Sequence, residues 1–431
     1  MDFLTANDKL GEYPSSYYAA TTDLLPKQTS LIGETRADVC VIGAGYMGLS
    51  TALHLAELGY SVALVDAQRI GFGASGRNGG QVSSDQRLDQ HALEHMVGKD
   101  QARRLWQISQ ESLDLVKSLA KKHDIDIGWQ SGIIHADHRA RNVKETHEYA
   151  EFLAQNYNYN LIKPLDKDEI RHLVRSDSYY GGSIDMGGGH LHPLRYAVGL
   201  ARACYDAGVK IYEQTRVTEI IEGNPALVLA EAGQISADFV VMGCNGYLGK
   251  MQGRVATRVM PINNFIAATE PLGNPNDVLR GGHAVADSKY VINYFRLSDD
   301  NRLLFGGGES YGYRFPSDIA AKVRKPMVEI FPQLSDVRID YAWGGTLGIT
   351  MNRMPHFERL SGNILSLSGF SGHGVAMATM AGKIAAETIA GQAERFDVMA
   401  QVPTPKFPGG TAFRWPLLVL AMLWFGLLDR I

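Results

Sequence analysis

Cysteine is scarce in this sequence, and the few cysteines form no functional pattern. Among 431 residues there are three, Cys40, Cys204 and Cys244, which lie far apart and include no Cys-x-x-Cys pair. Zinc sites and redox dithiols need closely spaced cysteines, and a disulfide framework needs an even number of them. We therefore expect no disulfide framework, no metal site and no redox dithiol. Each thiol is expected to be buried and reduced.

Neither sign of charge dominates. The 42 basic and 46 acidic residues give a formal net charge of −4, so the basic surface of a nucleic-acid-binding protein is not indicated. The first residues contain no basic stretch followed by an apolar run, which a secretory signal peptide would have. We therefore expect no nucleic-acid partner and a cytoplasmic location.

The sequence has no apolar run long enough to span a membrane. Trp415–Leu428 (WPLLVLAMLWFGLL), in the C-terminal segment 401–431, falls short of the about 20 residues that a spanning helix needs. It is apolar nearly all round and lacks the polar face of an interfacial helix. We expect this tail to pack on the body of the protein. The alternatives are an oligomer contact or a peripheral membrane contact.

Glycine, by contrast, is abundant, with 46 residues, many of them in short clusters. The first cluster, GAGYMG at 43–48, stands between a predicted buried strand at Ala37–Ile42 and a predicted helix at Tyr46–Leu58. A second strand is predicted at Val62–Val65, and Asp66 follows it directly. This strand–turn–helix–strand unit is typical of dinucleotide-binding folds.

Each part of this unit has a physical role in binding a dinucleotide. The first glycine permits the tight turn, the second lets backbone approach a pyrophosphate, and the third lets helix and strand pack closely. The helix N-terminus offers free N–H groups and partial positive charge to the phosphates. A carboxylate at the end of the second strand accepts hydrogen bonds from ribose hydroxyls. The unit predicts a dinucleotide site without separating FAD from NAD.

Two later glycine clusters favour a flavin. Gly71–Gln81 (GFGASGRNGGQ) follows the second strand, and we expect it to run from the pyrophosphate toward the flavin, with Ser75 and Arg77 among its donors. Gly369–Gly374 (GFSGHG) precedes a helix predicted at 375–390, whose N-terminus would stabilise negative charge on a reduced flavin. The alternatives are a flexible surface loop for the first cluster and an ordinary strand-to-helix turn for the second.

The rest of the chain has a different pattern. Residues 91–122 and 141–156 have helical spacing, residues 165–190 break into short pieces, and residues 258–310 alternate β-like segments with glycine and proline, as an antiparallel sheet would. A second complete dinucleotide unit, typical of flavin reductases that use NAD(P)H, is missing from the sequence. Electrons are therefore expected to come from an organic substrate.

Several short segments, spread over nearly the whole chain, are specific enough to indicate a family. They are SSYYAA (15–20), RIGFGASGRNGGQ (69–81), GGHLHPL (188–194), DNRLLFGGG (300–308), SGHGV (371–375), AERFD (393–397) and FPGG (407–410). Together they resemble the D-amino-acid oxidase superfamily of FAD-dependent oxidoreductases, and within it the bacterial gamma-glutamylputrescine oxidoreductases.

This resemblance implies an activity. It is the oxidative deamination of a primary amine, gamma-glutamylputrescine or a similar gamma-glutamylated polyamine, to an aldehyde and ammonia, with hydride transfer to flavin N5. The alternative is a D-amino-acid or secondary-amine (glycine- or sarcosine-like) dehydrogenase that passes electrons to a quinone. A protein that keeps the flavin fold only to bind a partner would be a third, non-catalytic possibility.

The expected fold class is α/β. A Rossmann-like FAD-binding domain is interleaved with an α+β substrate domain built on an antiparallel sheet. We expect residues 1–84, 190–255 and 342–400 in the FAD-binding domain and residues 85–189 and 256–341 in the substrate domain. Residues 401–431 form the apolar C-terminal tail.

The expected cofactor is noncovalently bound FAD. Some sarcosine oxidases attach flavin through a cysteine before the late FAD motif and use a lysine near the flavin to promote reaction with oxygen. The corresponding stretches, 343–355 and 301–307, contain neither residue, so the electron acceptor, oxygen or another molecule, stays open. The residues expected to hold FAD are Gly43, Ala44, Gly45, Tyr46, Met47, Asp66, Ala67, Gly73, Ala74, Ser75, Arg77, Asn78, Gly79, Gly80, Gln81, Val217, Cys244, Asn245, Gly372, His373, Gly374 and Val375.

Hydride transfer requires the reacting carbon within van der Waals reach of flavin N5, a neutral amine and a dry pocket. Arg353 and Arg296 are candidates for receiving a glutamyl carboxylate, although surface ion pairs are the commoner use of arginine. For the aromatic and histidine candidates, a purely structural role in the core is the alternative. The candidates for the catalytic pocket are His373, Trp343, Tyr290 and Tyr294.

Overall fold

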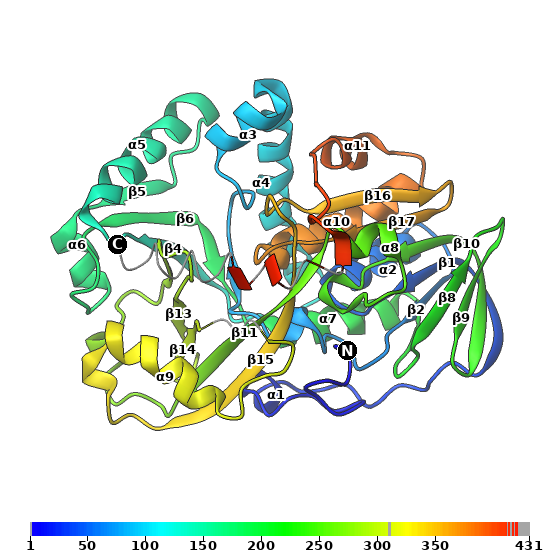
Figure 1. Cartoon of the computed structure of the whole chain (residues 1–431), viewed down its shortest axis with the longest axis horizontal. Helices are drawn as coiled ribbons and strands as arrows, with labels where there is room; N and C mark the ends of the chain where they lie inside the picture. Colours follow the sequence, from blue (N-terminus) through cyan, green and yellow to red (C-terminus); the bar gives the residue numbers. More distant parts are fainter. Residues whose placement is uncertain (1, 309–311, 412, 414–415, 418, 421–431) are drawn as a thin grey trace.

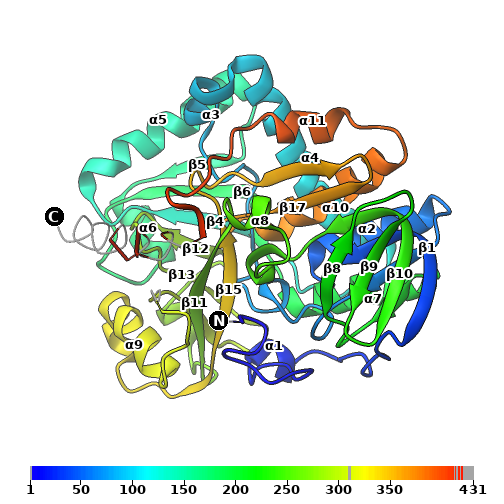
Figure 2. The same cartoon turned by 45° about the vertical axis from the view of Figure 1, so that its right-hand side comes forward.

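The computed structural model of the chain describes residues 2–308, 312–411, 413, 416–417 and 419–420. Two sheets dominate this part, and they stand side by side in Figures 1 and 2. No helix in these ranges is long and apolar enough to cross a membrane. Most of Trp415–Leu428 lies outside the described residues, so its packing on the body of the protein stays a prediction.

The first sheet has a parallel centre built from buried apolar strands. Its main order is β16–β17–β10–β1–β2–β7, in which the edge strand β16 runs antiparallel to its neighbour. Off this path, β9 (Ala226–Ala230) pairs antiparallel with β10 and with β8 (Val217–Ile221). β1 and β2 confirm the strands predicted from their apolar runs, because strands covered on both faces need apolar residues on both. The strands are β1 (Gly33–Ile42), β2 (Val62–Val65), β7 (Lys210–Tyr212), β10 (Gly233–Met242), β16 (His356–Ser361) and β17 (Ile364–Ser368).

Alternate residues of β1 point to opposite faces of this sheet. Val39 and Val41 belong to the apolar core on the helical face, and Cys40 and Ile42 belong to the core on the other face. The helical face holds α2 (Tyr46–Glu57), α4 (Lys99–Lys122), α7 (Pro193–Asp206) and α10 (Gly374–Ile389), and the other face holds β8 (Val217–Ile221), β9 (Ala226–Ala230) and α8 (Gly253–Ala256).

The helical stretch predicted at 91–122 is two helices. α3 (Gln90–Val97) ends at Gly98, whose φ of +82° lies in the left-handed region. α4 begins at the next residue and leads on to the second sheet. A glycine inside a helical pattern is ambiguous in a sequence, because it is compatible with either continuation or a C-terminal cap.

The second sheet is mostly antiparallel and lies on the left in Figure 1. Its order is β15–β11–β14–β13–β12–β4–β6–β3, with β5 beside β6, and β12 and β4 form a parallel pair. β6 is continuous where short pieces were predicted, because β4 and β5 pair with its glycine-rich backbone. The strands are β3 (Gln81–Val82), β4 (Gln130–Ala136), β5 (Ile162–Leu165), β6 (Gly182–His190), β11 (Met260–Thr269), β12 (Ala284–Asp287), β13 (Tyr294–Leu297), β14 (Leu303–Gly306) and β15 (Ile339–Ile349).

The two faces of the second sheet have different partners. One face packs on α9 (Ile319–Ile330) in an apolar core of its own. On the other face, Leu304 and Trp343 pack with Leu194 of α7 and with the tyrosines of α1 (Tyr17–Ala20). The second sheet therefore stands directly against the helical layer of the first.

This architecture confirms the predicted α/β fold class, with a mainly parallel sheet and a mainly antiparallel sheet built from alternating stretches of chain. β15 pairs with β11 from Ile339 to Ile349. We propose that the two sheets mark the two interleaved domains, and that the boundary predicted at 342 lies after residue 349.

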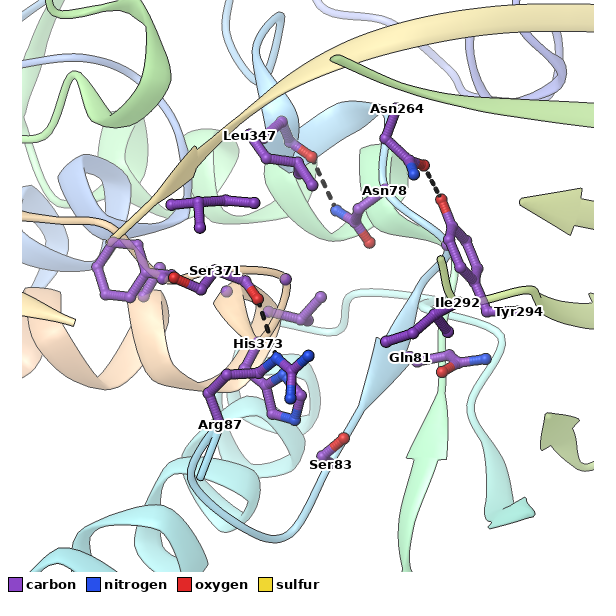
Figure 3. Close-up of a pocket in the computed structure, with 18 of the residues that line it drawn as sticks. Asn78, Gln81, Ser83, Arg87, Asn264, Ile292, Tyr294, Leu347, Ser371 and His373 are labelled. Carbon is purple, nitrogen blue, oxygen red and sulfur yellow. Dashed lines mark hydrogen bonds between the residues drawn. The ribbon is translucent and has the colours of Figure 1, made fainter. Parts of the chain in front are cut away.

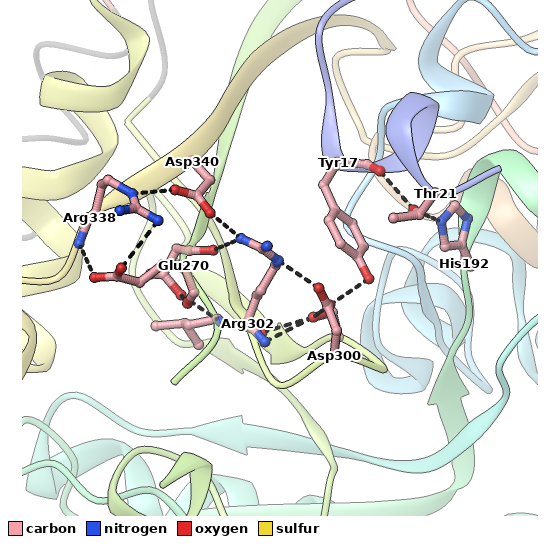
Figure 4. Close-up of polar contacts among 11 residues, drawn as sticks. Tyr17, Thr21, His192, Glu270, Asp300, Arg302, Arg338 and Asp340 are labelled. Atoms are coloured by element: carbon pink, nitrogen blue, oxygen red, sulfur yellow. Dashed lines mark hydrogen bonds and ion pairs between the residues drawn. The ribbon is translucent and has the colours of Figure 1, made fainter. Parts of the chain in front are cut away.

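A chain of polar contacts ties α1 to the second sheet (Figure 4). The Tyr17 hydroxyl donates to Asp300, in the turn between β13 and β14, at 2.8 Å. Arg302 joins Asp300 to Asp340, with both N–O distances at 2.6 Å, and Asp340 also pairs with Arg338 at 2.6 Å. Ion pairs at a partly exposed surface stabilise a fold only modestly. The main effect of this network is to hold the N-terminal segment in place.

Helix α10 crosses α2 at Gly382, where the backbones nearly touch. A Cβ added at Gly382 would lie 2.4 Å from the Met47 carbonyl oxygen and 2.6 Å from Ser50 Cβ. We predict that Gly382→Ala lowers the free energy of unfolding by about 1–3 kcal/mol, as overpacking does, measured by urea denaturation of the flavin-loaded protein. Gly253→Ala is the control, because a Cβ there would meet nothing within 4 Å. Equal stability of the two variants would contradict the close approach.

Candidate cofactor and substrate site

The GAGYMG turn is so tight that side chains are excluded at two of its positions. Gly43 has a φ of +106°, and its N–H donates to the Val65 carbonyl of β2 at 2.8 Å. A Cβ on Gly48 would lie 1.8 Å from the Gly43 carbonyl oxygen, so the first turn of α2 packs directly on the loop. The N-terminus of α2 therefore stands at the carboxyl end of β1.

Asp66, at the end of β2, accepts two backbone hydrogen bonds. Its Oδ2 accepts from the Ala44 N–H and its Oδ1 from the Gln68 N–H, both at 2.7 Å. Burial raises the pKa of Asp66 to about 6. Each carboxylate oxygen has a further lone pair, so the group keeps acceptors for ribose hydroxyls. The Thr215 N–H donates to the Asp66 carbonyl at 2.7 Å, which brings the segment leading to Val217 beside this acid.

A cavity of about 510 Å³ is lined by residues of both sheets at the point where α2 and α10 begin (Figure 3). A volume of this size is usual for a ligand site. The cavity brings together many of the residues predicted to hold FAD, namely Gly45, Tyr46, Met47, Ala74, Ser75, Arg77, Asn78, Gly79, Gln81, Asn245, Gly372, His373, Gly374 and Val375. The predicted residues that do not line it are Gly43, Ala44, Asp66, Ala67, Gly73, Gly80, Val217 and Cys244.

The two helices that begin at this cavity have N-cap residues that provide no capping side chain, although the Tyr46 N–H of α2 donates to Ser75 Oγ at 3.0 Å. Neither Gly45, the N-cap of α2, nor His373, the N-cap of α10, makes a capping hydrogen bond. Such helix ends present N–H groups and partial positive charge, which suit phosphates and the oxygen atoms of a flavin. The residues present therefore fit FAD, and bound FAD supplies the hydride acceptor.

Arg77 was predicted to donate to FAD. Most of its guanidinium donors are used inside the protein, but its buried Nη2 has no hydrogen-bond partner among the described residues, so donation to FAD stays a prediction. Nη1 lies 3.0 Å from both carboxylate oxygens of Asp8 and 3.1 Å from the Gly344 carbonyl, and Nε donates to the Phe72 carbonyl at 2.6 Å. The side chain is only 1% exposed. Arg77 therefore holds the N-terminal segment and β15 together, because a buried guanidinium must be paired.

Tyr294 lies where the sequence predicted an aromatic wall. It lines the cavity, and its hydroxyl donates to Asn264 Oδ1 at 2.5 Å. The ring crosses over Gly306 of the neighbouring strand, where a Cβ would lie 2.0 Å from it. Gly306 therefore makes the room that lets Tyr294 reach Asn264 across β14.

Trp343, Tyr290 and Arg296 do not line the cavity. Trp343 is 2% exposed in the core between α1 and α7, and its Nε1–H donates to the Arg77 carbonyl at 3.0 Å. Tyr290 is 55% exposed. Arg296 is buried and donates to the carbonyls of Gly79 and Leu191 at 2.8 and 3.1 Å. Trp343 thus has the structural core role that was its alternative, whereas Arg296 is buried on backbone carbonyls and does not form the surface ion pair that was its alternative.

His373 lines the cavity beside a carboxylate that no motif marks. Its Nε2 lies 3.7 Å from Asp85 Oδ1. Burial lowers the pKa of His373, and the nearby Arg87 adds to this effect, although Asp85 opposes it. His373 is therefore neutral at pH 7. Arg87 Nε donates to the Ser371 carbonyl at 3.3 Å, so two contacts tie the loop after β3 to the second glycine cluster.

The cavity also collects further charged residues, of which the sequence analysis singled out only Arg353, as a candidate for a glutamyl carboxylate. They lie on β4, on the turns after β12 and β15, and on the loop after β3. In the sequence each is a lone charged residue, and such residues are mostly solvent-exposed. For Asp85 and Arg87, the only signal in the sequence was that they closely follow the Gly71–Gln81 cluster. They are Asp85, Arg87, His135, Lys289 and Arg353.

Sequence comparison places these features in a known class of flavoenzymes. Residues 38–388 match the family described as FAD dependent oxidoreductase (DAO), and the chain belongs to this family. It is 39% identical over 423 residues to the gamma-glutamylputrescine oxidoreductase of Escherichia coli (strain K12), covering 97% of this chain and 99% of that one. It is 40% identical over 416 residues to the probable oxidoreductase OrdL of Rhizobium meliloti (strain 1021), covering 96% and 97% of the two chains.

The fold is shared with solved flavoenzymes. The crystal structure of glycine oxidase from Geobacillus kaustophilus matches with a TM-score of 0.72 at 19% identity, covering 83% of this chain and 95% of that one. At this level of identity the likeness concerns the fold. Together with the family match, it confirms that the chain is an FAD-dependent oxidoreductase.

Removing the carboxylate at the end of β2 should weaken FAD retention. We predict that Asp66→Ala is purified with a lower ratio of FAD to protein, because each lost charged hydrogen bond costs about 1.5–3 kcal/mol. Asp38→Ala is the matched control, because Asp38 accepts from the Ser61 N–H at 2.7 Å at the other end of the same strands. Full flavin content in Asp66→Ala, or an equal loss in Asp38→Ala, would show that Asp66 does not hold the ribose.

The flavin should be released without breaking a covalent bond. Cys40 and Cys204 are buried in the core, and Cys244, although next to Asn245, does not line the cavity. Burial raises the pKa of Cys244 to about 12, which disfavours the reactive thiolate. We predict that acid precipitation transfers all the yellow colour to the supernatant. Colour that stays with the pellet would reveal a covalent link.

Proposed function

We propose that this chain oxidises the terminal primary amine of gamma-glutamylputrescine, or of a similar gamma-glutamylated polyamine, to an aldehyde and ammonia. Bound FAD would supply the hydride acceptor, and oxygen or another molecule would be the final electron acceptor. The similarity to an amine oxidoreductase supports the proposal. The observation that carries it is the excess of positive charge on the walls of the cavity.

Positive charge is in excess at the cavity, because cations outnumber the two carboxylates that line it, Asp85 and Asp287. Arg87, Arg353 and Lys289 line it, and within the described residues neither arginine lies within 4.0 Å of a carboxylate oxygen. A free diamine such as putrescine carries two positive charges at pH 7, so these walls repel it. An amine that also carries a carboxylate is attracted instead. The charge therefore favours a gamma-glutamylated amine over a free polyamine.

The reacting amine has to be neutral, because an ammonium group has no lone pair to assist the loss of hydride from its carbon. In water a primary amine of this kind has a pKa of about 10.4. The Tyr294 hydroxyl donates to Asn264 at the wall of the cavity, which fixes the position of its ring there. Loss of hydride from carbon and of a proton from nitrogen gives an imine, which water hydrolyses to the aldehyde and ammonia.

Anaerobic flavin reduction tests this proposal directly. We predict that gamma-glutamylputrescine bleaches the flavin with a kred/Kd at least about 100-fold higher than that of putrescine, because putrescine lacks the carboxylate that the cationic walls attract. The measurement is stopped-flow absorbance, with ammonia and aldehyde assayed as products.

Sarcosine, glycine and D-alanine are run in parallel, because the competing function is a D-amino-acid or secondary-amine dehydrogenase that passes electrons to a quinone. Bleaching by one of these compounds but not by gamma-glutamylputrescine would refute the proposal. Oxygen consumption with and without added membranes then identifies the electron acceptor.

A further inference from the structure

One end of the cavity carries a compact set of opposite charges. Asp85 and Arg87 extend from the loop after β3 and Arg353 from the turn after β15, and all three line the cavity. In Figure 3, Arg87 lies at the end away from Tyr294 and Asn264. Burial and Arg353 lower the pKa of Arg87 while Asp85 raises it, so the three charges are close enough to act on one another.

These charged groups keep hydrogen-bonding capacity for a ligand. Arg87 donates through Nε to the Ser371 carbonyl at 3.3 Å, which fixes its position without using a carboxylate. Asp85 lies 3.7 Å from His373 Nε2, and its side chain is 30% exposed. Two guanidinium groups and one carboxylate therefore face the same space.

The backbone at Arg353 is unusual. Its φ of +67° lies in the left-handed region, which residues with long side chains rarely adopt. The Arg353 N–H donates to the Thr350 carbonyl at 3.2 Å and closes the turn after β15. Glycine would form this turn without strain. A strained arginine at a ligand cavity therefore points to a function for its side chain.

We propose that Arg87 and Arg353 bind the α-carboxylate, and Asp85 the α-ammonium, of a free amino-acid head group. This end of the cavity then recognises the glutamyl part of the substrate as a zwitterion. The inference rests on the proposed function, because it assigns the non-reacting end of that substrate. Guanidinium groups suit a carboxylate because they offer N–H donors in a fixed plane.

The arrangement also accounts for selection among amines. Two arginines and one aspartate leave a surplus positive charge, which repels a free diamine and tolerates a zwitterion. With the head group held near Arg87, an extended chain carries the second amine toward Tyr294 and Asn264. A substrate of this class therefore needs a zwitterion and a primary amine separated by several bonds.

Three substrates separate the head-group contacts. They are gamma-glutamylputrescine, its 4-aminobutyryl analogue without the α-carboxylate, and its glutaryl analogue without the α-ammonium. Anaerobic flavin reduction gives kred/Kd for each. In the unaltered enzyme, we expect each analogue to lose about 10- to 100-fold, the effect of one missing charge-assisted contact.

Each variant should have a lower kred/Kd only for the substrates that carry the group its side chain binds. In Arg353→Gln, kred/Kd should fall about 10- to 100-fold for gamma-glutamylputrescine and the glutaryl analogue, which carry the carboxylate. For the 4-aminobutyryl analogue, which lacks it, kred/Kd should fall about 2-fold or less. In Asp85→Asn, kred/Kd should instead stay nearly unchanged for the glutaryl analogue, which lacks the α-ammonium. Arg353→Lys keeps the charge and should recover part of the loss. Arg359→Gln is the control, because Arg359 is exposed, lies outside the cavity and pairs with Asp397 at 3.6 Å.

Binding without turnover gives an independent readout. The probe is gamma-glutamylbutylamine, which has the head group and no reacting amine. Its Kd is measured from the change in flavin absorbance. We expect this Kd to rise about 10- to 100-fold in Arg353→Gln. If the probe binds the unaltered enzyme but gamma-glutamylputrescine does not reduce the flavin, the proposed function fails and the head-group site stands. If gamma-glutamylputrescine is oxidised but Arg353→Gln weakens all three substrates equally, or the probe does not bind, the head-group assignment is overturned.

Discussion

Helix α2 lies so close to the loop before it and to helix α10 that the contacts are backbone to backbone, and the site depends on this closeness. Gly48 lets the first turn of α2 rest on Gly43, and Gly382 lets α10 cross at Met47. Because both helices converge, their N-termini open on one cavity. A side chain at either glycine would push the helices apart and separate two sources of partial positive charge that suit one dinucleotide.

Charged residues near this cavity fall into two groups. Arg77 pairs with Asp8, and Arg296 donates to backbone carbonyls, so the fold uses most of the donors of both guanidinium groups. Arg87 and Arg353 also line the cavity, but within the described residues neither pairs with a carboxylate, so both keep donors for a ligand. A buried charge is costly unless it is paired. This explains why Arg77 and Arg296, which have partners in the protein, are enclosed, whereas Arg87 and Arg353 lie at the surface of a site. The division supports an amine substrate that brings its own carboxylate.

The nucleotide-binding half could largely be predicted because its signals are local. A strand, a glycine turn, a helix and a terminal acid are neighbours along the chain, and each constrains the next. The rest was harder for the same reason. Gly98 divides a helical pattern that continues on both sides of it. The strand β6 is rich in glycine, which has low strand propensity, so the sequence did not indicate one continuous strand paired with β4 and β5.

By itself, the sequence determined the dinucleotide unit, the family and the α/β class. Only the tertiary structure decided which polar and aromatic side chains face the cavity. Trp343 and Arg296 are enclosed by the packing of the second sheet on α1 and α7, whereas Arg87 and Arg353 are brought together from loops far apart in the chain. The physical reason is that local sequence sets only the direction of a side chain relative to its own strand or turn. The packing of one sheet against another then decides whether that direction leads to the core, to solvent or to a ligand.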